Sequence, residues 1–423
     1  MRVLFLSQLW PYPPDSGGKV KAYHALRGLA ADHEVTLLAF ARPEDSFHDC
    51  PEVTSLCRQV KVVVRARSPW RDLRELCLSM ARGRAFTLER DRNAEMSAAV
   101  TGLCDAREFD VIHADRLHMA AFVPQPTRAA TILDAHNVES QVFARLSRGW
   151  SNPVRRGLYR LEARHLAAAE GRIVAGFDHV LCVSQADRDN LVVLAGAHFA
   201  GREPAFSVIP VGVDCRYFGA RALLRHPHRL LLVGNLGWPP NAEAAVWCLQ
   251  EVFPHLRRAL PRLRLVIIGA RAPLAVRRLA RQPGVILRGY VPDLRPEYAQ
   301  AAALLVPLRS GSGMRVKILE AFAAGLPVVS TTVGAEGIEA VSDRHLLLAD
   351  DARAFAAAAI RVLTTPRLAH RLSAESRSLA ESHYDWPLLH DRLRGVYWEI
   401  AQNRDRHAQH GRFDLVEPAR RGR

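Results

Sequence analysis

The residues best suited to chemistry lie in a Ser/Gly-rich loop that leads into an apolar helix. The segment from Leu304 to Pro327 reads LLVPLRSGSGMRVKILEAFAAGLP, which predicts a buried strand, a loop and a helix that ends near Gly325. The loop amides from Gly311 to Met314 would stand at the N-terminus of this helix, where unpaired N–H groups and the helix dipole favour an anion. The segment therefore predicts an anion-binding site.

Two cations and one carboxylate indicate that this anion is a phosphate. We expect Arg315 and Lys317 in the first turn of the helix, where they oppose the helix dipole, so an incoming phosphate would explain their presence. Glu320 lies one turn further on among apolar neighbours, so we expect its carboxylate to be half-buried and to need partners such as ribose hydroxyls. An ordinary helix with a Lys317–Glu320 ion pair at i,i+3 is the alternative.

A second glycine loop follows the first predicted strand, residues 2–7. Gly17 and Gly18 precede a helix that we expect to end near Ala31, and two glycines let a ligand approach the backbone closely. The spacing matches neither G-x-G-x-x-G nor a Walker loop, so it does not indicate a dinucleotide-binding or NTPase site. An ordinary strand-to-helix turn is the alternative.

Polar residues also follow the strand predicted at 129–134. Asp134 and His136 lie at its carboxyl end, which is where open α/β sheets bind ligands. His136 is placed to hydrogen-bond a substrate or an acceptor, and Asp134 to orient the imidazole. Capping of the following helix is the alternative. His113 ends another predicted strand and suggests a similar role.

Two series of alternating strands and helices would position these loops. We predict strands at 2–7, 35–41, 60–64, 109–113, 129–134 and 178–183 in the first series, and at 230–233, 263–269, 285–287, 302–306, 328–330 and 346–348 in the second. Such alternation indicates parallel sheets with helices on both faces. Proline and glycine in the segment 206–214 predict a hinge. Two such halves imply a cleft between them.

Composition favours an intracellular protein with an anionic partner. The 423 residues carry a net charge of +15, almost all of the positive charge from arginine, and no nucleic-acid-binding motif accompanies it. An anionic surface or a phosphorylated substrate is therefore the expected partner. The seven cysteines are scattered without ligand-like spacing, so we expect reduced thiols and no structural metal. Neither a signal peptide nor an apolar run of about 20 residues is evident, which indicates the cytoplasm.

Two arginine-rich segments are candidates for contact with a membrane or an acceptor. Residues 65–93 interleave arginines with Leu, Met and Phe and contain Trp70. The pattern from about Ser140 to Ala175 is helical and carries several arginines, Trp150 and Tyr159. A basic amphipathic stretch with a tryptophan is typical of helices on an anionic bilayer surface. A solvated helix face is the alternative for both segments.

With these residues in view, the chain resembles retaining glycosyltransferases of the GT-B fold, in glycosyltransferase family 4 (group 1). The resemblance covers nearly all of residues 1–400. It rests on Gly17-Gly18, on VGVD at 211–214, VGN at 233–235 and GYVPD at 289–293, and above all on KILEAFAAGLPVV at 317–329. Within the family, the chain looks nearest to a subgroup tied to exopolysaccharide assembly and exosortase-type loci.

The resemblance implies an α/β GT-B architecture, in which two Rossmann-like doubly wound domains face a cleft. The expected parts are an N-terminal acceptor-side domain (1–212), a C-terminal nucleotide-sugar-binding domain (213–384), a crossover helix that packs on the N-terminal domain (385–400) and a mobile basic tail (401–423).

The family also implies roles for the loop residues. The donor would be a nucleotide sugar, with Glu320 on its ribose hydroxyls and His136 near the sugar and the acceptor. The diphosphate and the sugar would lie between the amides that follow Ser312 and the glycine loop. The expected donor-binding residues are Gly17, Gly18, Gly234, Asn235, Ser312, Gly313, Met314, Arg315, Lys317 and Glu320, and the expected catalytic residues are His136, Arg315, Lys317 and Glu320.

This chain departs from the family pattern at two places. The first of two glutamates that the family spaces seven residues apart falls on Ser312 here. Asn235 and Asn241 stand where many members carry an arginine and a lysine, so Arg315 and Lys317 would supply the lost positive charge. The contacts to the donor sugar usually assigned to the first glutamate are therefore uncertain.

The expected reaction is a metal-independent, retaining transfer of a sugar from a nucleotide-diphosphate sugar to a lipid-linked or polysaccharide acceptor. Exopolysaccharide or cell-envelope glycan synthesis is the expected context, in the cytoplasm or peripherally on the inner face of the plasma membrane. No cofactor besides the donor and no nucleic-acid partner is expected. A nucleotide-sugar epimerase on the same fold and a non-catalytic nucleotide-sugar-binding partner remain alternatives.

Overall fold

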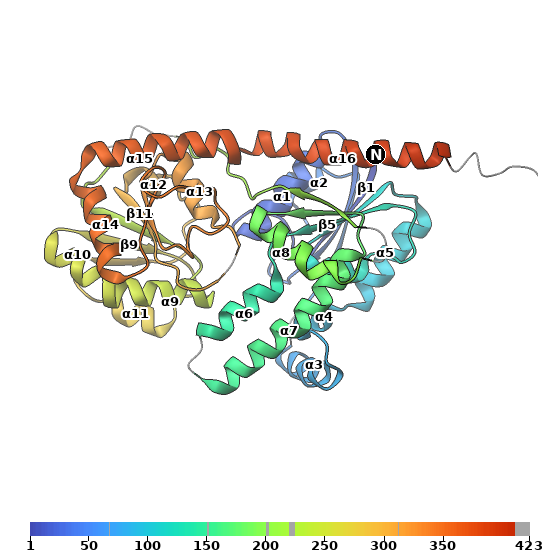
Figure 1. Cartoon of the computed structure of the whole chain (residues 1–423), viewed down its shortest axis with the longest axis horizontal. Coiled ribbons are helices and arrows are strands. Elements are labelled where there is room, and N and C mark those ends of the chain that lie inside the picture. Colours follow the sequence, from blue (N-terminus) through green and yellow to red (C-terminus); the bar gives the residue numbers. More distant parts are fainter. Residues whose placement is uncertain (67, 150–151, 200–202, 220–224, 312, 411–423) are drawn as a thin grey trace, which may run out of the picture.

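The computed structural model describes residues 1–66, 68–149, 152–199, 203–219, 225–311 and 313–410. Two residues singled out above, Ser312 and Trp150, lie outside these ranges. Figure 1 shows two sheet-containing halves, with the C-terminal helices forming a row that extends along both.

The N-terminal half is built on a seven-stranded parallel sheet with the strand order β3-β2-β1-β4-β5-β6-β7. Its strands are β1 Arg2–Ser7, β2 Glu34–Ala41, β3 Gln59–Val64, β4 Val111–Asp115, β5 Ala130–Ala135, β6 His179–Cys182 and β7 Ala205–Val208. The central strands β4 and β5 are buried along almost their whole length because helices cover both faces of the sheet. The strand order reverses between β1 and β4, which makes this edge the topological switch point of the sheet.

Helices surround this sheet and connect its strands. They are α1 Gly17–Ala30, α2 Pro51–Thr54, α3 Pro69–Arg82, α4 Phe86–Asp91, α5 Ala94–Ala106, the 3-10 helix η1 Leu117–Phe122, α6 Glu139–Gly149, α7 Pro153–Ala175 and α8 Gln185–Gly196. The helical pattern expected from about Ser140 to Ala175 is present and is divided between α6 and α7. A new helix begins at Pro153, whose ring suits a first helical position, and the Asn152 side chain accepts hydrogen bonds from the amides of Val154 and Arg155.

The C-terminal half contains a second parallel sheet, six-stranded, in the order β10-β9-β8-β11-β12-β13. Its strands are β8 Arg229–Val233, β9 Arg264–Ile268, β10 Val285–Arg288, β11 Ala303–Val306, β12 Val328–Ser330 and β13 Leu347–Leu348. Its helices are α9 Pro239–Trp247, the π-helix η2 Cys248–Val252, α10 Phe253–Ala259, α11 Leu274–Leu279, α12 Arg295–Gln300, α13 Val316–Ala323, α14 Ala352–Thr364, α15 Pro366–Leu379 and the π-helix η3 Ala380–Tyr384. The switch point of this sheet lies between β8 and β11.

Helix α16 (Trp386–His410) crosses from the second half to the first (Figure 1). It begins where Val213 and Asp385 form a parallel bridge, so both chain crossings between the halves lie side by side. On the N-terminal half, the His24 ring of α1 stacks on Trp386 with 4.1 Å between centroids. The helix continues to His410 and so includes residues 401–410 of the tail expected at 401–423, and 411–423 lie outside the described residues.

Candidate active site

The loops at the two switch points face each other across the two halves. Gly17 opens α1 after β1, and a Cβ atom built on it would lie 3.4 Å from Cγ2 of Val316 in the first turn of α13. A Cβ atom on Gly313, in the loop after β11, would lie 2.2 Å from Oδ1 of Asn137, which follows β5. Two helix N-termini, one from each half, therefore lie against each other. Both attract anions.

The loop before α13 brings a buried cation to this junction. Gly311 and Gly313 have φ angles of 103° and 79°, a conformation that glycine adopts without strain. The Arg315 side chain folds back so that its guanidinium donates to the carbonyl of Gly313, and it is only 6% exposed. Arg315 is the N-cap residue of α13, one position before the first turn in which it was expected. Burial lowers the pKa of Arg315 to about 10, so it stays positively charged at neutral pH.

Lys317 lies beside the glycine that follows β8. Its Nζ donates to Oδ1 of Asn241 at 3.1 Å, and the Asn241 amide in turn donates to the carbonyl of Asn235 at 2.9 Å. A Cβ atom on Gly234 would come within 2.8 Å of the Lys317 Nζ, so only glycine leaves room for this ammonium group. Burial and the neighbouring Arg315 lower the pKa of Lys317 to about 7, although Glu320 opposes the shift.

Glu320 has a protein partner that the sequence did not suggest. The hydroxyl of Tyr298, which is fully buried on α12, donates to Oε2 of Glu320 at 2.6 Å. Burial raises the pKa of Glu320, while the Tyr298 hydrogen bond and Lys317 hold the rise back. The side chain is half-buried, as expected. Among the described residues, no ion pair within 4.0 Å joins Glu320 to Lys317, which argues against the ordinary i,i+3 pair.

On the N-terminal side, His136 lies against a carboxylate of the neighbouring strand. Its Nε2 is 2.8 Å from Oδ1 of Asp115, at the end of β4, and 3.9 Å from Oδ2 of Asp134. We expected Asp134 to orient the imidazole, but Asp115 lies nearer to it and is its main partner. Asp134 is engaged elsewhere, because it is ion-paired with Lys21 of α1 and both side chains are buried. Burial lowers the pKa of His136, which leaves the imidazole mostly neutral at pH 7.

The same three side chains form the one cluster of potential metal ligands found in the described part of the chain. One ligand atom each from Asp115, Asp134 and His136 lie within 4.8 Å of one another. The Lys21 ammonium already meets the charge of Asp134. Burial alone would raise the pKa of Asp134, but Lys21 and the neighbouring histidines hold it below its ordinary value. A divalent cation would therefore have to compete with a resident ammonium ion.

His113 has a structural environment instead of a substrate-facing one. It is fully buried, its ring stacks on Phe5 at 4.7 Å, and its Nδ1 lies 2.9 Å from the Tyr397 hydroxyl of α16. The suggested resemblance to the role of His136 is therefore not supported.

A small pocket, of about 20 Å³, lies between the halves beside Gly313. Arg145 of α6 and Glu336 of the second half line it and form an ion pair across the junction. Asp187 lies in the same pocket and accepts a hydrogen bond from the Ser184 hydroxyl at 2.7 Å. Both carboxylates of the pocket thus have partners from the protein.

The structure brings most of the expected donor-binding residues to the two facing loops. Gly17, Gly18, Gly234, Asn235, Gly313, Met314, Arg315, Lys317 and Glu320 lie on the segments that follow β1, β8 and β11. His136 follows β5, and the side chain of its neighbour Asn137 lies against Gly313 in this region. Sequence reasoning missed Lys21, Asp115 and Tyr298. For Asp115, its place at the carboxyl end of a predicted strand was the available signal.

Comparison with known proteins agrees with this architecture. A family model described as glycosyl transferases group 1 matches residues 227–365. A Klebsiella pneumoniae protein, named as an uncharacterized 44.6 kDa protein in the cps region, is 22% identical over 372 residues, which is 84% of this chain and 89% of that protein.

Solved structures are similar over almost the whole chain. Sucrose-phosphate synthase from Thermosynechococcus elongatus superposes with a TM-score of 0.70 at 18% identity, covering 95% of this chain and 100% of that one. Anabaena HepE, in a complex with UDP and glucose, gives 0.64 at 14% identity, with 94% and 100% covered. WaaG, a glycosyltransferase involved in lipopolysaccharide biosynthesis, gives 0.62 at 17% identity, with 92% and 98% covered. The expected GT-B fold is confirmed. Together with the family model over residues 227–365, this fold supports a glycosyltransferase of the GT-B type.

Proposed function

We propose that this protein transfers a sugar from a nucleotide-diphosphate sugar to a lipid-linked or polysaccharide acceptor, with retention of configuration and without a metal. The proposal rests on the contact between the N-termini of α1 and α13. Arg315 and Lys317 lie at this contact, and neither helix has a carboxylate in its first turn. A diphosphate neutralises such a site. The complex of HepE with UDP and glucose, on the same fold, supports a nucleotide-sugar donor.

The leaving diphosphate is the group that needs stabilisation in this reaction. Breaking the bond between the sugar and the phosphate places negative charge on the departing oxygen, and preorganised cations and amides stabilise that charge. Arg315, Lys317 and the amides after Gly311 would supply this stabilisation, and Glu320 would hold the ribose. With the charge met by protein cations, no metal ion is required.

Retention is proposed through a front-face route, in which the leaving phosphate accepts the proton of the acceptor hydroxyl. A double displacement would require a free carboxylate next to the anomeric carbon. Of the two carboxylates that line the pocket beside Gly313, Glu336 is ion-paired with Arg145 and Asp187 accepts a hydrogen bond from Ser184. Neutral His136, held by Asp115, would then hydrogen-bond the sugar or the acceptor instead of acting as a strong base.

The context we propose is synthesis of an exopolysaccharide or cell-envelope glycan on the cytoplasmic side of a membrane. Support comes from the relative in a cps region and from the surface of α3. Trp70, Leu73 and Met80 of this helix are 82%, 52% and 47% exposed, whereas its Ser79 is buried. An amphipathic helix whose apolar side faces outward suits an interfacial position. Figure 1 shows α3 at the periphery of the N-terminal half.

Membrane binding is tested with vesicles. Arg71, Arg74 and Arg82 flank the apolar side of α3, so binding should need anionic lipid and weaken with added salt. Replacing Trp70 by alanine should lower vesicle binding, whereas Trp398→Ala, which removes a 61% exposed tryptophan of α16, should not. Equal loss in both variants, or binding that is indifferent to lipid charge and salt, would refute the role of α3. No described helix combines the length and the apolar composition that a membrane span requires.

Sugar transfer is tested by titrating the purified protein with UDP-, GDP- and ADP-sugars and following its unfolding temperature, because a bound donor stabilises the fold by mass action. Transfer or slow hydrolysis of the stabilising donor, unaffected by a chelator and giving a product of unchanged anomeric configuration, supports the proposal. Glu320→Gln should weaken donor binding, whereas the surface variant Glu375→Gln should not. Donor binding without turnover would favour the non-catalytic partner, and conversion of the donor sugar would favour the epimerase.

A further inference from the structure

Arg116, which follows β4 at the switch point of the first sheet, is held in an unusual backbone conformation. Its φ and ψ angles are 79° and 156°, a region that is essentially reserved for glycine. The conformation is fixed by two hydrogen bonds: its amide donates to the carbonyl of Asp134 at 2.9 Å, and its carbonyl accepts from the amide of Met119 at 3.0 Å. Glycine at this position would relieve the strain. An arginine at position 116 therefore costs backbone free energy, which indicates that its side chain is needed there.

The Arg116 guanidinium is directed onto the glycine loop. A Cβ atom built on Gly18 would lie 1.4 Å from Nη2 of Arg116, so the guanidinium occupies the space that any other residue at position 18 would fill. Nη1 donates to Oε1 of Gln8 at 3.3 Å. Across the described residues, no carboxylate lies within 4.0 Å of this guanidinium. The Arg116 guanidinium is half-buried and its side-chain partner is a neutral amide. Its positive charge can therefore still bind an anionic ligand.

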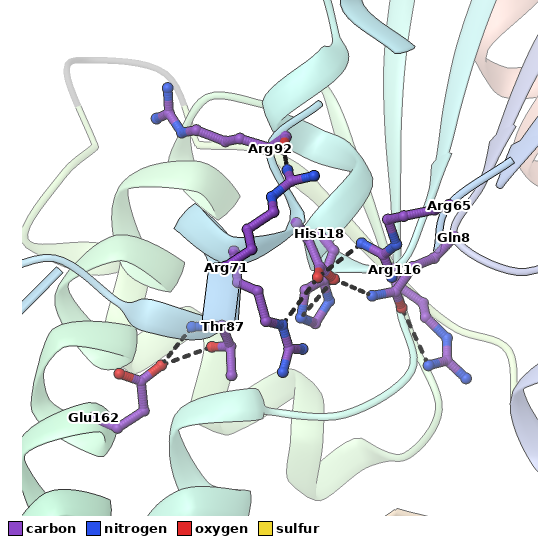
Figure 2. Close-up of polar contacts among 10 residues, drawn as sticks. Gln8, Arg65, Arg71, Thr87, Arg92, Arg116, His118 and Glu162 are labelled. Carbon is purple, nitrogen blue, oxygen red and sulfur yellow. Dashed lines mark hydrogen bonds and ion pairs between the residues drawn. The ribbon is translucent and has the colours of Figure 1, made fainter. Parts of the chain in front are cut away.

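A chain of polar contacts behind Arg116 orients Gln8, the hydrogen-bond partner of its guanidinium (Figure 2). Gln8 follows β1, and its Nε2 donates to Oδ2 of the buried Asp91 at 2.9 Å, which turns its Oε1 toward Arg116. Arg65, which follows β3, and Arg90 both contact Oδ1 of Asp91, at 2.8 and 3.2 Å. Asp91 is thus saturated by groups other than Arg116, and the cluster as a whole carries more positive than negative charge.

We propose that Arg116 is a substrate-binding residue that takes a phosphate oxygen from the N-terminal side of the site, with Gln8 and Asp91 as its positioning residues. The inference rests on the proposed sugar transfer for the identity of the substrate. The geometry that carries it is the contact of Arg116 with Gly18, next to Gly17, which in turn faces Val316 of α13. Cations of both halves would then meet one substrate. The phosphate belongs either to the donor diphosphate or to a phosphate-bearing acceptor.

Arg116→Gly is the sharpest variant because binding and folding should respond in opposite directions. It removes the guanidinium and also the backbone strain, so the unfolding temperature should stay level or rise while affinity for the phosphate ligand falls about tenfold, with inorganic pyrophosphate in calorimetry as the probe for a donor phosphate and micelles containing a polyprenyl phosphate as the probe for an acceptor phosphate. Gly18→Ala keeps the charge but displaces the guanidinium, and should weaken the same binding. Arg361→Gln, which removes an exposed charge of α14, and Gly102→Ala, where a Cβ meets open space, are the matched controls.

A second assay separates the two sources of phosphate. If Arg116 binds the donor diphosphate, Arg116→Gly lowers the affinity for pyrophosphate and raises the KM for the nucleotide sugar. If the acceptor is bound, pyrophosphate affinity is unchanged, but binding to micelles containing a polyprenyl phosphate falls relative to micelles of the uncharged polyprenol. Unchanged binding in both assays, or a lowered unfolding temperature without any change in binding, would overturn the proposal. An Arg116-dependent anion affinity in a protein that transfers no sugar would leave this site standing and refute the proposed function instead.

Discussion

Donor binding is predicted to depend on the protonation of Lys317. The ammonium group is packed between Gly234 and Asn241 and next to Arg315, and its pKa is lowered to about 7. A diphosphate is attracted to the charged form and not to the neutral amine. In the ligand-free protein, the protonated fraction should therefore fall from about nine-tenths at pH 6 to about one-tenth at pH 8, which predicts a roughly tenfold loss of donor affinity over this range.

Calorimetry with a nucleotide sugar suits this test, because its diphosphate is esterified at both ends and loses no proton between pH 6 and 8. Lys317→Met should bind weakly with a flat pH profile. Asn241→Asp places a carboxylate where the amide oxygen now lies 3.1 Å from Nζ, so it should raise the pKa of Lys317 and shift the loss of affinity to higher pH. A wild-type profile that is flat from pH 6 to 8, or one that Lys317→Met leaves unchanged, would refute the reasoning.

The same shift has a consequence for stability whose sign is fixed by linkage. The pKa of Lys317 is lower in the folded protein, at about 7, than its ordinary value of 10.5, so between these values the unfolded chain binds more protons than the native one. The free energy of unfolding must then rise with pH in this window, as far as this group is concerned. Wild-type protein should gain stability relative to Lys317→Met between pH 7 and pH 10, and a constant difference would contradict the lowered pKa.

Three further predictions follow from buried contacts. Tyr298→Phe removes the hydrogen bond to ionised Glu320 and should cost about 1.5–3 kcal/mol of unfolding free energy at pH 8 but less at pH 5, since a protonated carboxyl needs that donor less; an equal cost at both pH values would contradict it. Lys21→Met leaves buried Asp134 without its cation and should cost about 3–5 kcal/mol in denaturant titrations, most of which a second change, Asp134→Asn, should restore. Arg145→Ala breaks a partly exposed ion pair between the halves and should weaken donor affinity by no more than about fivefold, without changing the unfolding midpoint measurably.

The sequence was informative where one physical pattern dominates. Continuous apolar runs predicted the strands, because strands of a parallel sheet are buried on both faces. The Ser/Gly loop before an apolar helix predicted the anion site, because glycine and a helix start have direct conformational meaning. The helix break at Asn152-Pro153 was also readable from capping residues, yet the apolar and arginine periodicity of 140–175 concealed it.

Pairings between distant segments could not be read in the same way. Which carboxylate contacts His136 depends on the adjacency of β4 and β5, and the partner is Asp115 instead of the sequence neighbour Asp134. Tyr298 lies on a short helix with no local pattern that distinguishes a core tyrosine from one that serves Glu320. The backbone strain of Arg116 has no sequence signal at all, because it arises from hydrogen bonds to Asp134 and to η1.

The charges at the junction explain why closure and donor binding should be coupled. Burial disfavours the charged forms of Arg315 and Lys317 when no ligand is present, and repulsion from Arg145 on Arg315 and from Arg315 on Lys317 adds to this, as their lowered pKa values show. Bringing the α1 N-terminus and Arg116 against α13 adds positive potential to the same place, so without an anion the closed arrangement is electrostatically unfavourable. A bound diphosphate reverses the sign of that interaction. The Arg145–Glu336 pair contributes only weakly because both side chains are about one-third exposed, at 33% and 35%. A bound donor would therefore add a favourable electrostatic contribution to the contacts between the two halves.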